Sequence, residues 1–381
     1  MRVLIFCHSL ISDWSDDNAH FLRGIATELG ARGHHVRVYE EKNASSARNP
    51  TSNCGMGAIE AFHAAYPNLK IVRYEMKNLD LHDALYAADL VLVHERNHPE
   101  LVRRIGRYRE DWGNFLLFFH DTRQRPASDA DEISEFDLTG YDGVLASGEA
   151  ITELYRSRRW HPRVWTWHEA ADVRGVHSNG NGHKNGRASG RSGSYEGDLV
   201  WIGKWAEDER GDELREFLIE PARELGLKTR IYGVGYPQHA LDELKRANLE
   251  YGEWLPSYEV PRVFAKFRMT IHVPRRPYVE APPGVPAIRV FEAMACGIPL
   301  VSAVWRDAEG LFNPGQDYLV ANDGAEMTRH LAMLKQNPRR ARELARHARR
   351  TILERHTCAH RVDELLAICG RSTGASREVL V

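Results

Sequence analysis

The sequence predicts an α/β protein with two doubly wound parallel sheets, and three observations lead to this fold class. Short apolar runs rich in β-branched residues alternate with amphipathic segments along the chain, which is typical of parallel α/β architecture. A chain of 381 residues is long for one hydrophobic core, so two domains are expected. Residues 174–198 are rich in Gly, Ser and Asn and nearly free of apolar side chains, which predicts a flexible linker or a mobile loop.

The first half contains six apolar runs that predict strands. They are residues 2–8, 35–40, 70–74, 90–94, 115–120 and 143–147. Between the first two strands, residues 18–34 predict a helix, and residues 149–160 predict another. The first of these helices has apolar residues at helical spacing, namely Phe21, Leu22, Ile25, Ala26 and Leu29.

The second half repeats the pattern with five apolar runs. They are residues 199–204, 228–233, 270–274, 299–303 and 318–321, and a basic, Ala-rich helix is expected at 339–356. We therefore expect a first domain at 1–173, the linker at 174–198, a second domain at 199–366 and a tail at 367–381. Two such domains imply a cleft between the carboxyl ends of two parallel sheets, where ligands bind in these folds.

Composition and charge exclude several classes of protein. The formal net charge of −2 gives no overall field that attracts nucleic acid or an anionic membrane, although local basic patches stay open. The apolar N-terminal run is too short for a membrane span and lacks a signal-peptide cleavage site. The five scattered cysteines form no CxxC pair and indicate reduced thiols in a cytoplasmic protein. Nucleophile-elbow, Walker and HExxH motifs are absent, and the acidic residues 129–132 do not resemble an Asp-x-Asp metal site.

Cations follow two of the strands expected in the second domain. Lys204 and Arg210 come after the first strand, where they would straddle a diphosphate; a solvated charged loop is the alternative, because three acidic residues lie between them. Arg275 and Arg276 follow a later strand and favour an anionic ligand. Between these two strands in sequence lies the run 228–233. Gly235 follows it and ends a Gly-x-Gly that lets the backbone approach a ligand closely.

A short helix is expected from Pro286 to the residue before Gly297. Gly284 permits close approach to its N-terminus, whose N–H groups and dipole suit a phosphate. Within this apolar helix, Glu292 either accepts hydrogen bonds from ribose hydroxyls or pairs with Arg289 one turn earlier. We favour the ligand, because a buried carboxylate without partners costs several kcal/mol.

In the first domain, polar residues stand where apolar strands end. His120 ends the strongly apolar run 115–120 and Asp121 follows it; a histidine there orients a substrate hydroxyl or caps the next element. His94 and Glu95 hold a similar place one strand earlier. The polar loop after the first strand, with Asn18 and His20 near its end, is either an acceptor-binding segment or a long exposed loop.

Taken in order, these segments resemble the two-domain (GT-B) glycosyltransferases, in which two Rossmann-like domains face each other across a cleft, and specifically the retaining family 4 group with its CgeB-type relatives. The resemblance is strongest over about 199–366, in "LVWIGKWAEDER", "IYGVGYP", "FEAMACGIPLVSA", "GLFNPGQDYLVA" and "TILERHT". It extends into the first half through "GIATELGARGHHVRVY" and through "TWHEAADVRGVHS", where Asp172 matches the aspartate of the family's crossover between domains.

This resemblance implies roles for the candidate residues. Glu292 matches the glutamate that binds the nucleotide ribose, Lys204 and Arg210 match the pair that clamps the diphosphate, Gly235 lies near the base and phosphates, and His120 matches a histidine near the reacting sugar. The family often has a second glutamate eight residues before the ribose glutamate, and here that position is Gly284.

We therefore expect a hexosyltransferase-type glycosyltransferase that moves a sugar from a nucleotide-diphosphate sugar to an acceptor hydroxyl, with retention and without metal or another cofactor. His120, Lys204 and Arg210 are the candidate catalytic residues. Donor-binding residues are expected at Glu292, Arg289, Gly284, Gly235, Arg275 and Arg276, and acceptor-side residues at Asn18, His20 and Asp121. The acceptor is a glycan, a lipid-linked molecule or a small molecule; no nucleic acid is expected, and peripheral membrane contact stays open. The alternatives are a sugar-nucleotide epimerase of the same fold and a non-catalytic nucleotide- or sugar-binding protein.

Overall fold

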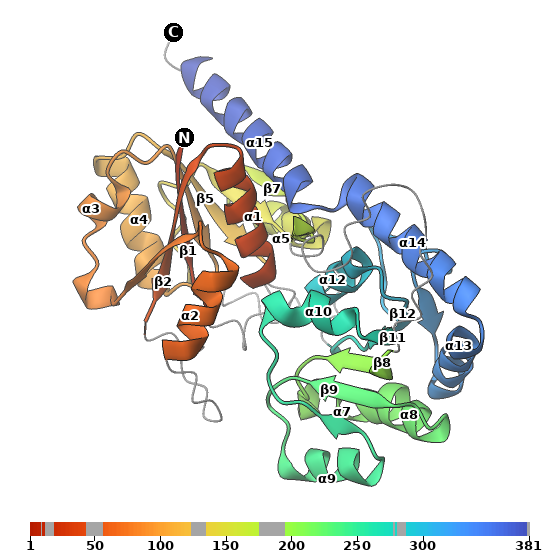
Figure 1. Ribbon diagram of the computed structural model, residues 1–381. Coiled ribbons are helices and arrows are strands. Elements are labelled where there is room, and N and C mark those ends of the chain that lie inside the picture. Colours follow the sequence, from red (N-terminus) through yellow and green to blue (C-terminus); the bar gives the residue numbers. More distant parts are fainter. Residues whose placement is uncertain are drawn as a thin grey trace, which may run out of the picture. The chain divides into compact units, whose positions relative to one another are not determined.

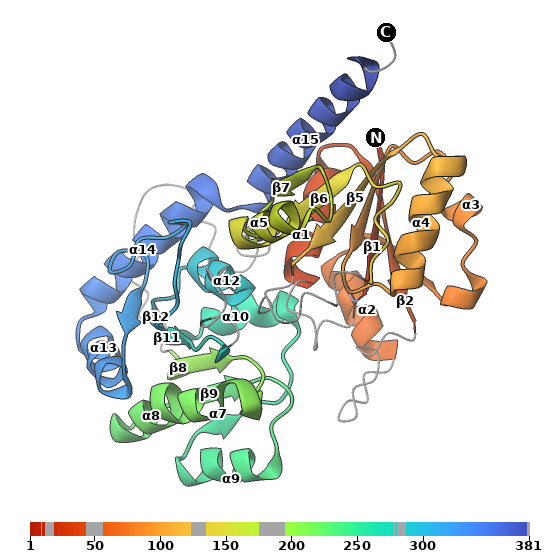
Figure 2. The ribbon, with the colours of Figure 1, turned by 180° about the vertical axis from the view of Figure 1, so that it is seen from behind.

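The computed structural model describes residues 1–8, 10–11, 19–42, 56–122, 135–174, 195–276, 279 and 287–378. It divides the chain into two compact units (Figures 1 and 2). The first unit consists of Met1–Glu169 and Cys358–Val381, and the second of Ala170–Thr357. Both units are α/β units with parallel sheets, as the alternating pattern predicts.

The first unit holds a seven-stranded sheet in the order β3-β2-β1-β4-β5-β6-β7, with every neighbouring pair parallel. Its strands are β1 Arg2–Cys7, β2 His35–Glu41, β3 Lys70–Tyr74, β4 Leu90–His94, β5 Leu116–Asp121, β6 Gly143–Ala146 and β7 Val164–Thr166. Its helices are α1 Ala19–Ala31, α2 Met56–Ala65, the short 3₁₀ helix Met76–Asn78, α3 Leu81–Leu85, α4 Pro99–Asp111, α5 Glu149–Arg158 and α15 Cys358–Glu378. Of these strands, β4 is buried along its whole length, as expected for a central strand covered on both faces.

The five apolar residues predicted for the first helix are all buried in α1. Figure 1 shows α15, the last helix of the chain, running beside α1. Its side chains Val362, Leu365 and Ile368 are at most 3 % exposed, and Trp167 Nε1 donates a hydrogen bond to the carbonyl of Arg361 at 2.9 Å. The apolar face of α15 is thus part of the core of the first unit.

The second unit holds a six-stranded sheet in the order β10-β9-β8-β11-β12-β13, again parallel throughout. Its strands are β8 Gly197–Ile202, β9 Thr229–Tyr232, β10 Glu250–Tyr251, β11 Phe267–His272, β12 Leu300–Ala303 and β13 Leu319–Ala321. Its helices are α7 Glu207–Leu214, the π-helical turn Arg215–Ile219, α8 Glu220–Glu224, α9 Gln238–Arg246, the 3₁₀ helix Ser257–Glu259, α10 Val260–Phe264, α12 Ile288–Cys296, α13 Gly324–Gln336 and α14 Pro338–Arg355.

The units differ from the expected domain limits at both joints. Residues 358–366, expected in the second domain, belong to the first unit, and residues 367–378, expected as a tail, continue α15. The first joint lies between Glu169 and Ala170 rather than after 173. Within the expected linker, β8 already begins at Gly197, and residues 175–194 lie outside the described residues.

Candidate functional site

The strand order of the second sheet locates the edge where a ligand is expected. The chain leaves β8 towards β9 and β10 on one side, and then returns to β11 on the other side. In open parallel sheets ligands bind outside the carboxyl ends of the two strands where the order reverses. Here these strands are β8 and β11, which are followed by Gly203 and Val273.

Arg210 lies at this reversal point. Its Nη2 donates a hydrogen bond to the carbonyl of Lys204 at 2.6 Å, and its Nη1 donates one to the carbonyl of Val273 at 3.0 Å. The guanidinium also stacks over the ring of Trp201, with 5.1 Å to the ring centroid. The structure therefore fixes a cation between the ends of β8 and β11. Lys204, also predicted for this edge, is half-buried in the loop that follows β8.

The two glycines after β9 have different physical requirements. A Cβ on Gly233 would lie 1.9 Å from the carbonyl oxygen of Gly203, so only glycine allows this loop to approach the end of β8 so closely. Gly235, the predicted donor-binding glycine, has φ +74° but open space around its Cα. The hydroxyl of Tyr236 also donates to the carbonyl of Gly203, at 3.1 Å. This loop is therefore held against the end of β8 through the close approach of Gly233 and the hydroxyl of Tyr236.

Glu292 is 2 % exposed and lies in the middle of α12. Its Oε2 accepts a hydrogen bond from Nη1 of Arg289 at 2.5 Å. The helix ends as predicted, with Gly297 in the left-handed conformation at φ +67°. Its N-cap residue, Ala287, forms no side-chain cap, and the first turn has no acidic residue. Gly284, predicted to lie before this N-terminus, is outside the described residues.

Arg275 and Arg276 have carboxylate partners on α7. Arg275 forms an ion pair with Glu209 at 3.1 Å. Arg276 forms ion pairs with Glu213 at 2.6 Å and Asp212 at 3.3 Å. Both arginines thus have counter-ions on α7, and their expected role in binding an anionic ligand stays a prediction.

His272, the last residue of β11, was missed at the sequence level. Ser302 Oγ donates to the carbonyl of Ala303 at 2.8 Å, so His272 Nδ1 acts as the donor to Ser302 Oγ at 3.0 Å. Burial, followed by the charge of Arg210, lowers the pKa of His272 to about 3. A neutral imidazole therefore stands next to Arg210. The available signal was its position, since His94 and His120 likewise stand at the end of apolar runs.

In the first sheet the strand order reverses between β1 and β4. The side-chain amide of Asn97 donates to the carbonyl of Phe6 at 2.9 Å and to that of His94 at 2.7 Å, which ties the ends of these two strands together. The rings of His94 and His120 lie 5.2 Å apart between centroids. The two histidines that follow apolar runs in the sequence are thus brought together at this edge.

His120 is 1 % exposed and packs against the rings of Phe21 and Trp167, with centroid distances of 5.7 and 5.0 Å. Within the described part of the chain, neither ring nitrogen of His120 has a hydrogen-bond partner. Burial, followed by the charge of His94, lowers the pKa of His120 well below its ordinary value. The imidazole is therefore neutral at physiological pH, and its two nitrogens provide one donor and one acceptor for a ligand.

The other predicted residues of the first unit are placed differently. Asp121 is fully buried and accepts a hydrogen bond from the hydroxyl of Tyr155 at 2.8 Å, and its acceptor-side role stays a prediction. His20 lies half-buried in the first turn of α1. Asn18 lies outside the described residues.

Two buried charges hold the segment after β1. Glu40 accepts hydrogen bonds from the backbone N–H groups of Leu10 and Ile11 at 3.0 and 2.9 Å, and Arg23 Nη1 donates to the carbonyl of Leu10 at 2.8 Å. Glu40 is 1 % exposed and Arg23 fully buried. Sequence reasoning missed both; the signal was an arginine among the apolar residues of the first helix.

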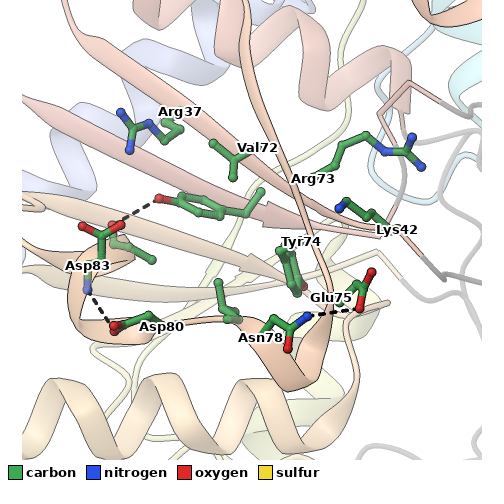
Figure 3. A pocket seen from close by; sticks show the side chains of 12 residues that line it. Arg37, Lys42, Val72, Arg73, Tyr74, Glu75, Asn78, Asp80 and Asp83 are labelled. Carbon is green, nitrogen blue, oxygen red and sulfur yellow. Dashed lines mark hydrogen bonds between the residues drawn. The ribbon is translucent and has the colours of Figure 1, made fainter. Parts of the chain in front are cut away.

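A separate pocket with a volume of about 330 Å³ opens beside β2, β3 and α3 (Figure 3). Its charged lining residues are of both signs, namely Arg37, Lys42, Arg73, Glu75, Asp80 and Asp83. Asp80 accepts hydrogen bonds from the backbone N–H groups of His82 and Asp83 and thereby caps α3. None of the predicted site residues lines this pocket.

The described residues contain no group of three or more His, Cys, Asp or Glu side chains placed to hold a metal ion. None of the described helices has the length and apolar character that a membrane crossing needs.

Comparison with known proteins adds one family match. Residues 213–367, less than half of the chain, match the family model described as glycosyl transferase-like. No curated protein matches the chain.

Solved structures with similar folds cover almost the whole chain. Sucrose-phosphate synthase from Thermosynechococcus elongatus is 13 % identical with a TM-score of 0.60, over 98 % of this chain and 100 % of that one. HepE from Anabaena, in complex with UDP and glucose, is 11 % identical with a TM-score of 0.64, over 97 % and 99 % of the two chains. A TarM mutant from S. aureus, in complex with fondaparinux, α-GlcNAc-glycerol and UDP, is 10 % identical with a TM-score of 0.65, over 97 % and 100 %. The chain thus has two parallel-sheet α/β domains like those of GT-B glycosyltransferases, and its second unit contains the segment similar to the glycosyl transferase-like family.

Proposed function

We propose that this protein is a glycosyltransferase that moves a sugar from a nucleotide-diphosphate sugar to an acceptor hydroxyl. The observation that carries the proposal is Arg210, a guanidinium held by two backbone carbonyls where the strand order of the second sheet reverses. The match of residues 213–367 to the glycosyl transferase-like family supports the same reaction.

In this reaction the bond between the anomeric carbon and the phosphate oxygen breaks, and its electron pair leaves with the nucleoside diphosphate. The acceptor oxygen forms the new bond to the anomeric carbon and loses its proton. Most of the barrier lies in the departure of the diphosphate, so groups that stabilise its growing negative charge accelerate the step. Arg210, Lys204 and the N-terminus of α12 are the groups we assign to this task, in place of a metal ion.

The remaining roles follow the sequence-level resemblance. Glu292 would accept hydrogen bonds from the ribose hydroxyls, and Arg289 would hold its carboxylate in place. His120 would orient a hydroxyl of the reacting sugar or of the acceptor, because its neutral ring offers one donor and one acceptor. Retention at the anomeric carbon is proposed from the likeness to the retaining family 4 and CgeB-type group. Uracil is the first base to test, since the HepE and TarM structures contain UDP.

Calorimetric titration in the absence of metal tests the donor site. UDP, GDP, ADP, CMP and NAD would be titrated into the wild type, Arg210→Gln and Arg268→Gln. Arg268→Gln is the matched control, because it removes an arginine near the start of β11 that pairs with Asp198 at 3.3 Å, at the other end of the strand from Val273. We expect one nucleoside diphosphate to bind the wild type and the control equally. Arg210→Gln should bind it about 10- to 100-fold more weakly, the effect of one hydrogen bond to a charged group.

The same titration with the corresponding nucleoside separates contact with the diphosphate from general damage. Affinity for the nucleoside should be equal in wild type and Arg210→Gln. Equal loss for nucleoside and diphosphate, or no nucleotide binding by the wild type, would overturn the proposed donor site. Turnover with a candidate acceptor, followed by NMR of the anomeric proton of the product, then tests transfer and retention. Release of the sugar without transfer to any acceptor would count against a transferase.

A further inference from the structure

Helix α14 carries a high positive charge, although the net charge of the whole chain is slightly negative. Residues Pro338–Arg355 contain seven arginines and two glutamates, whereas the whole chain has a net charge of −2. Figures 1 and 2 show α14 along the outer side of the second unit, beyond α12 and β12.

The two faces of α14 have opposite characters. The face towards the unit buries Leu344, Ala345, Ala348, Thr351 and Ile352. The outer face presents a line of three exposed side chains at positions i, i+4 and i+8, which we call the arginine row: Arg342, Arg346 and Arg350. Leu353, three residues further on the same face, is 38 % exposed.

No carboxylate among the described residues forms an ion pair with the arginine row. Glu343, the acidic residue next to Arg342 in sequence, forms its ion pair with Arg339 at 2.9 Å, and its charge also attracts Arg346. Like charges at i, i+4 spacing repel each other on a helix. The row thus places three like charges side by side on one face of α14, and Glu343 offsets part of their repulsion.

We propose that the arginine row binds the surface of an anionic phospholipid membrane. Such a surface presents phosphate groups in a plane, which a straight row on a convex helix contacts without needing a groove. Guanidinium groups bind phosphate oxygens through paired hydrogen bonds. The exposed Leu353 at the end of the row suits the boundary between headgroups and acyl chains. Single-stranded nucleic acid fits less well, because α14 has no Phe, Tyr or Trp on which bases stack.

The number of arginines in the row determines how strongly it should bind the membrane. Each arginine near an anionic membrane strengthens binding roughly fivefold, so the row strengthens it about a hundredfold. The attraction extends over a Debye length of about 8 Å in physiological salt. Because the chain as a whole is slightly acidic, binding requires this face to meet the membrane and weakens as salt rises.

The test is co-sedimentation of the full chain with vesicles of phosphatidylcholine alone and of phosphatidylcholine with about a third phosphatidylserine. The variants are R342Q/R346Q/R350Q and R342K/R346K/R350K. The matched control R107Q/R158Q/R223Q removes the same charge from three exposed arginines on α4, on α5 and on α8. Thermal unfolding of each variant checks that the fold is kept.

We expect the wild type and the control to bind anionic vesicles and not neutral ones. The glutamine row variant should bind about a hundredfold more weakly, and the lysine row variant should keep binding because its charge is kept. Equal binding of both vesicles, or full binding by the glutamine variant, would overturn the proposal. So would row-dependent binding of an oligonucleotide or an acidic peptide without vesicle binding. The experiment needs no turnover, so its outcome is independent of the proposed reaction.

Discussion

Arg289 and Glu292 form an ion pair of 2.5 Å one turn apart on α12, and their exposures differ: the carboxylate side chain is 2 % exposed and the guanidinium side chain 22 %. The side chain of Arg289 is thus partly exposed to solvent, and its positive charge stabilises the buried carboxylate of Glu292. The two sequence-level interpretations of Glu292, ion pair and ribose ligand, are compatible, because one carboxylate has two oxygens and only Oε2 binds Arg289 through the bond described above.

Arg289→Ala is expected to destabilise the second unit more than Glu292→Gln. The first substitution leaves a buried carboxylate without its cation and should cost about 3 kcal/mol. The second leaves a cation that can turn towards water and should cost about 1 kcal/mol. Urea unfolding gives both values. If Glu292 binds ribose, Glu292→Gln also weakens nucleotide binding about tenfold; unchanged affinity would leave only the structural pair.

Gly233→Ala is expected to destabilise the second unit far more than Gly235→Ala. A Cβ at 233 meets the carbonyl oxygen of Gly203 at 1.9 Å, so the ends of β8 and β9 must separate. At 235 the space is open, and alanine costs only the roughly 1 kcal/mol of a positive φ. Denaturant unfolding compares the two variants directly. Equal stability of both would show that the loop does not hold its close contact with β8.

The two buried histidines are expected to make the protein less stable in acid. Burial lowers the pKa of His120 and His272 in the folded state, so below about pH 6.5 the unfolded chain binds protons that the folded chain does not. Their contribution to stability is therefore complete above that pH and is lost as the pH falls, for His272 down to about 3. Each contributes a slope of up to about 1.4 kcal/mol per pH unit.

Unfolding measured by urea at a series of pH values tests this. His120→Asn and His272→Asn should each flatten the fall in stability between neutral and acidic pH. A wild-type slope that survives both buried substitutions would contradict the assignment.

Leu365→Ala in α15 is expected to destabilise the first unit by about 3 kcal/mol, because Leu365 is fully buried. Leu353→Ala, at a partly exposed leucine on α14, should change stability by less than about 0.5 kcal/mol. A chain that ends at Thr357 loses the whole helix and should not fold its first unit. Hydrogen exchange of β1 and α1 locates the effect; protection that persists without α15 would contradict its place in the core.

Sequence patterns predicted most strands of the two sheets, because these strands are apolar runs. The strands they missed are β7 and β10, which have three and two residues and too little pattern to detect. The apolar face of α15 is visible in the sequence, but nothing in it says which of two sheets the face covers. Its assignment to the first unit needed the packing against α1.

The candidate site was predictable where the order of the strands alone determines which residues lie close together. Residues after β8 and β11 must meet at one edge of a parallel sheet, and Arg210 is found there. Side-chain partners distant in sequence were not predictable. Arg276 and Glu213 are 63 residues apart in sequence, and Tyr155 and Asp121 are 34 apart. Only the folded chain therefore reveals the ion pair of the first two residues and the hydrogen bond of the second two.

The two joints between the units lie next to each other. Ala171, just after the first joint, donates a backbone hydrogen bond to His356, just before the second, at 3.0 Å, and Ala171 also forms a β-bridge with Thr357. The second unit is therefore an inserted module whose two ends are paired. A chimera that exchanges it for the corresponding module of another protein needs two cuts rather than one, and both fall within a few residues of this bridge. A single fusion point in the middle of the chain would take α15 from a different protein than the rest of the first unit, with which it packs.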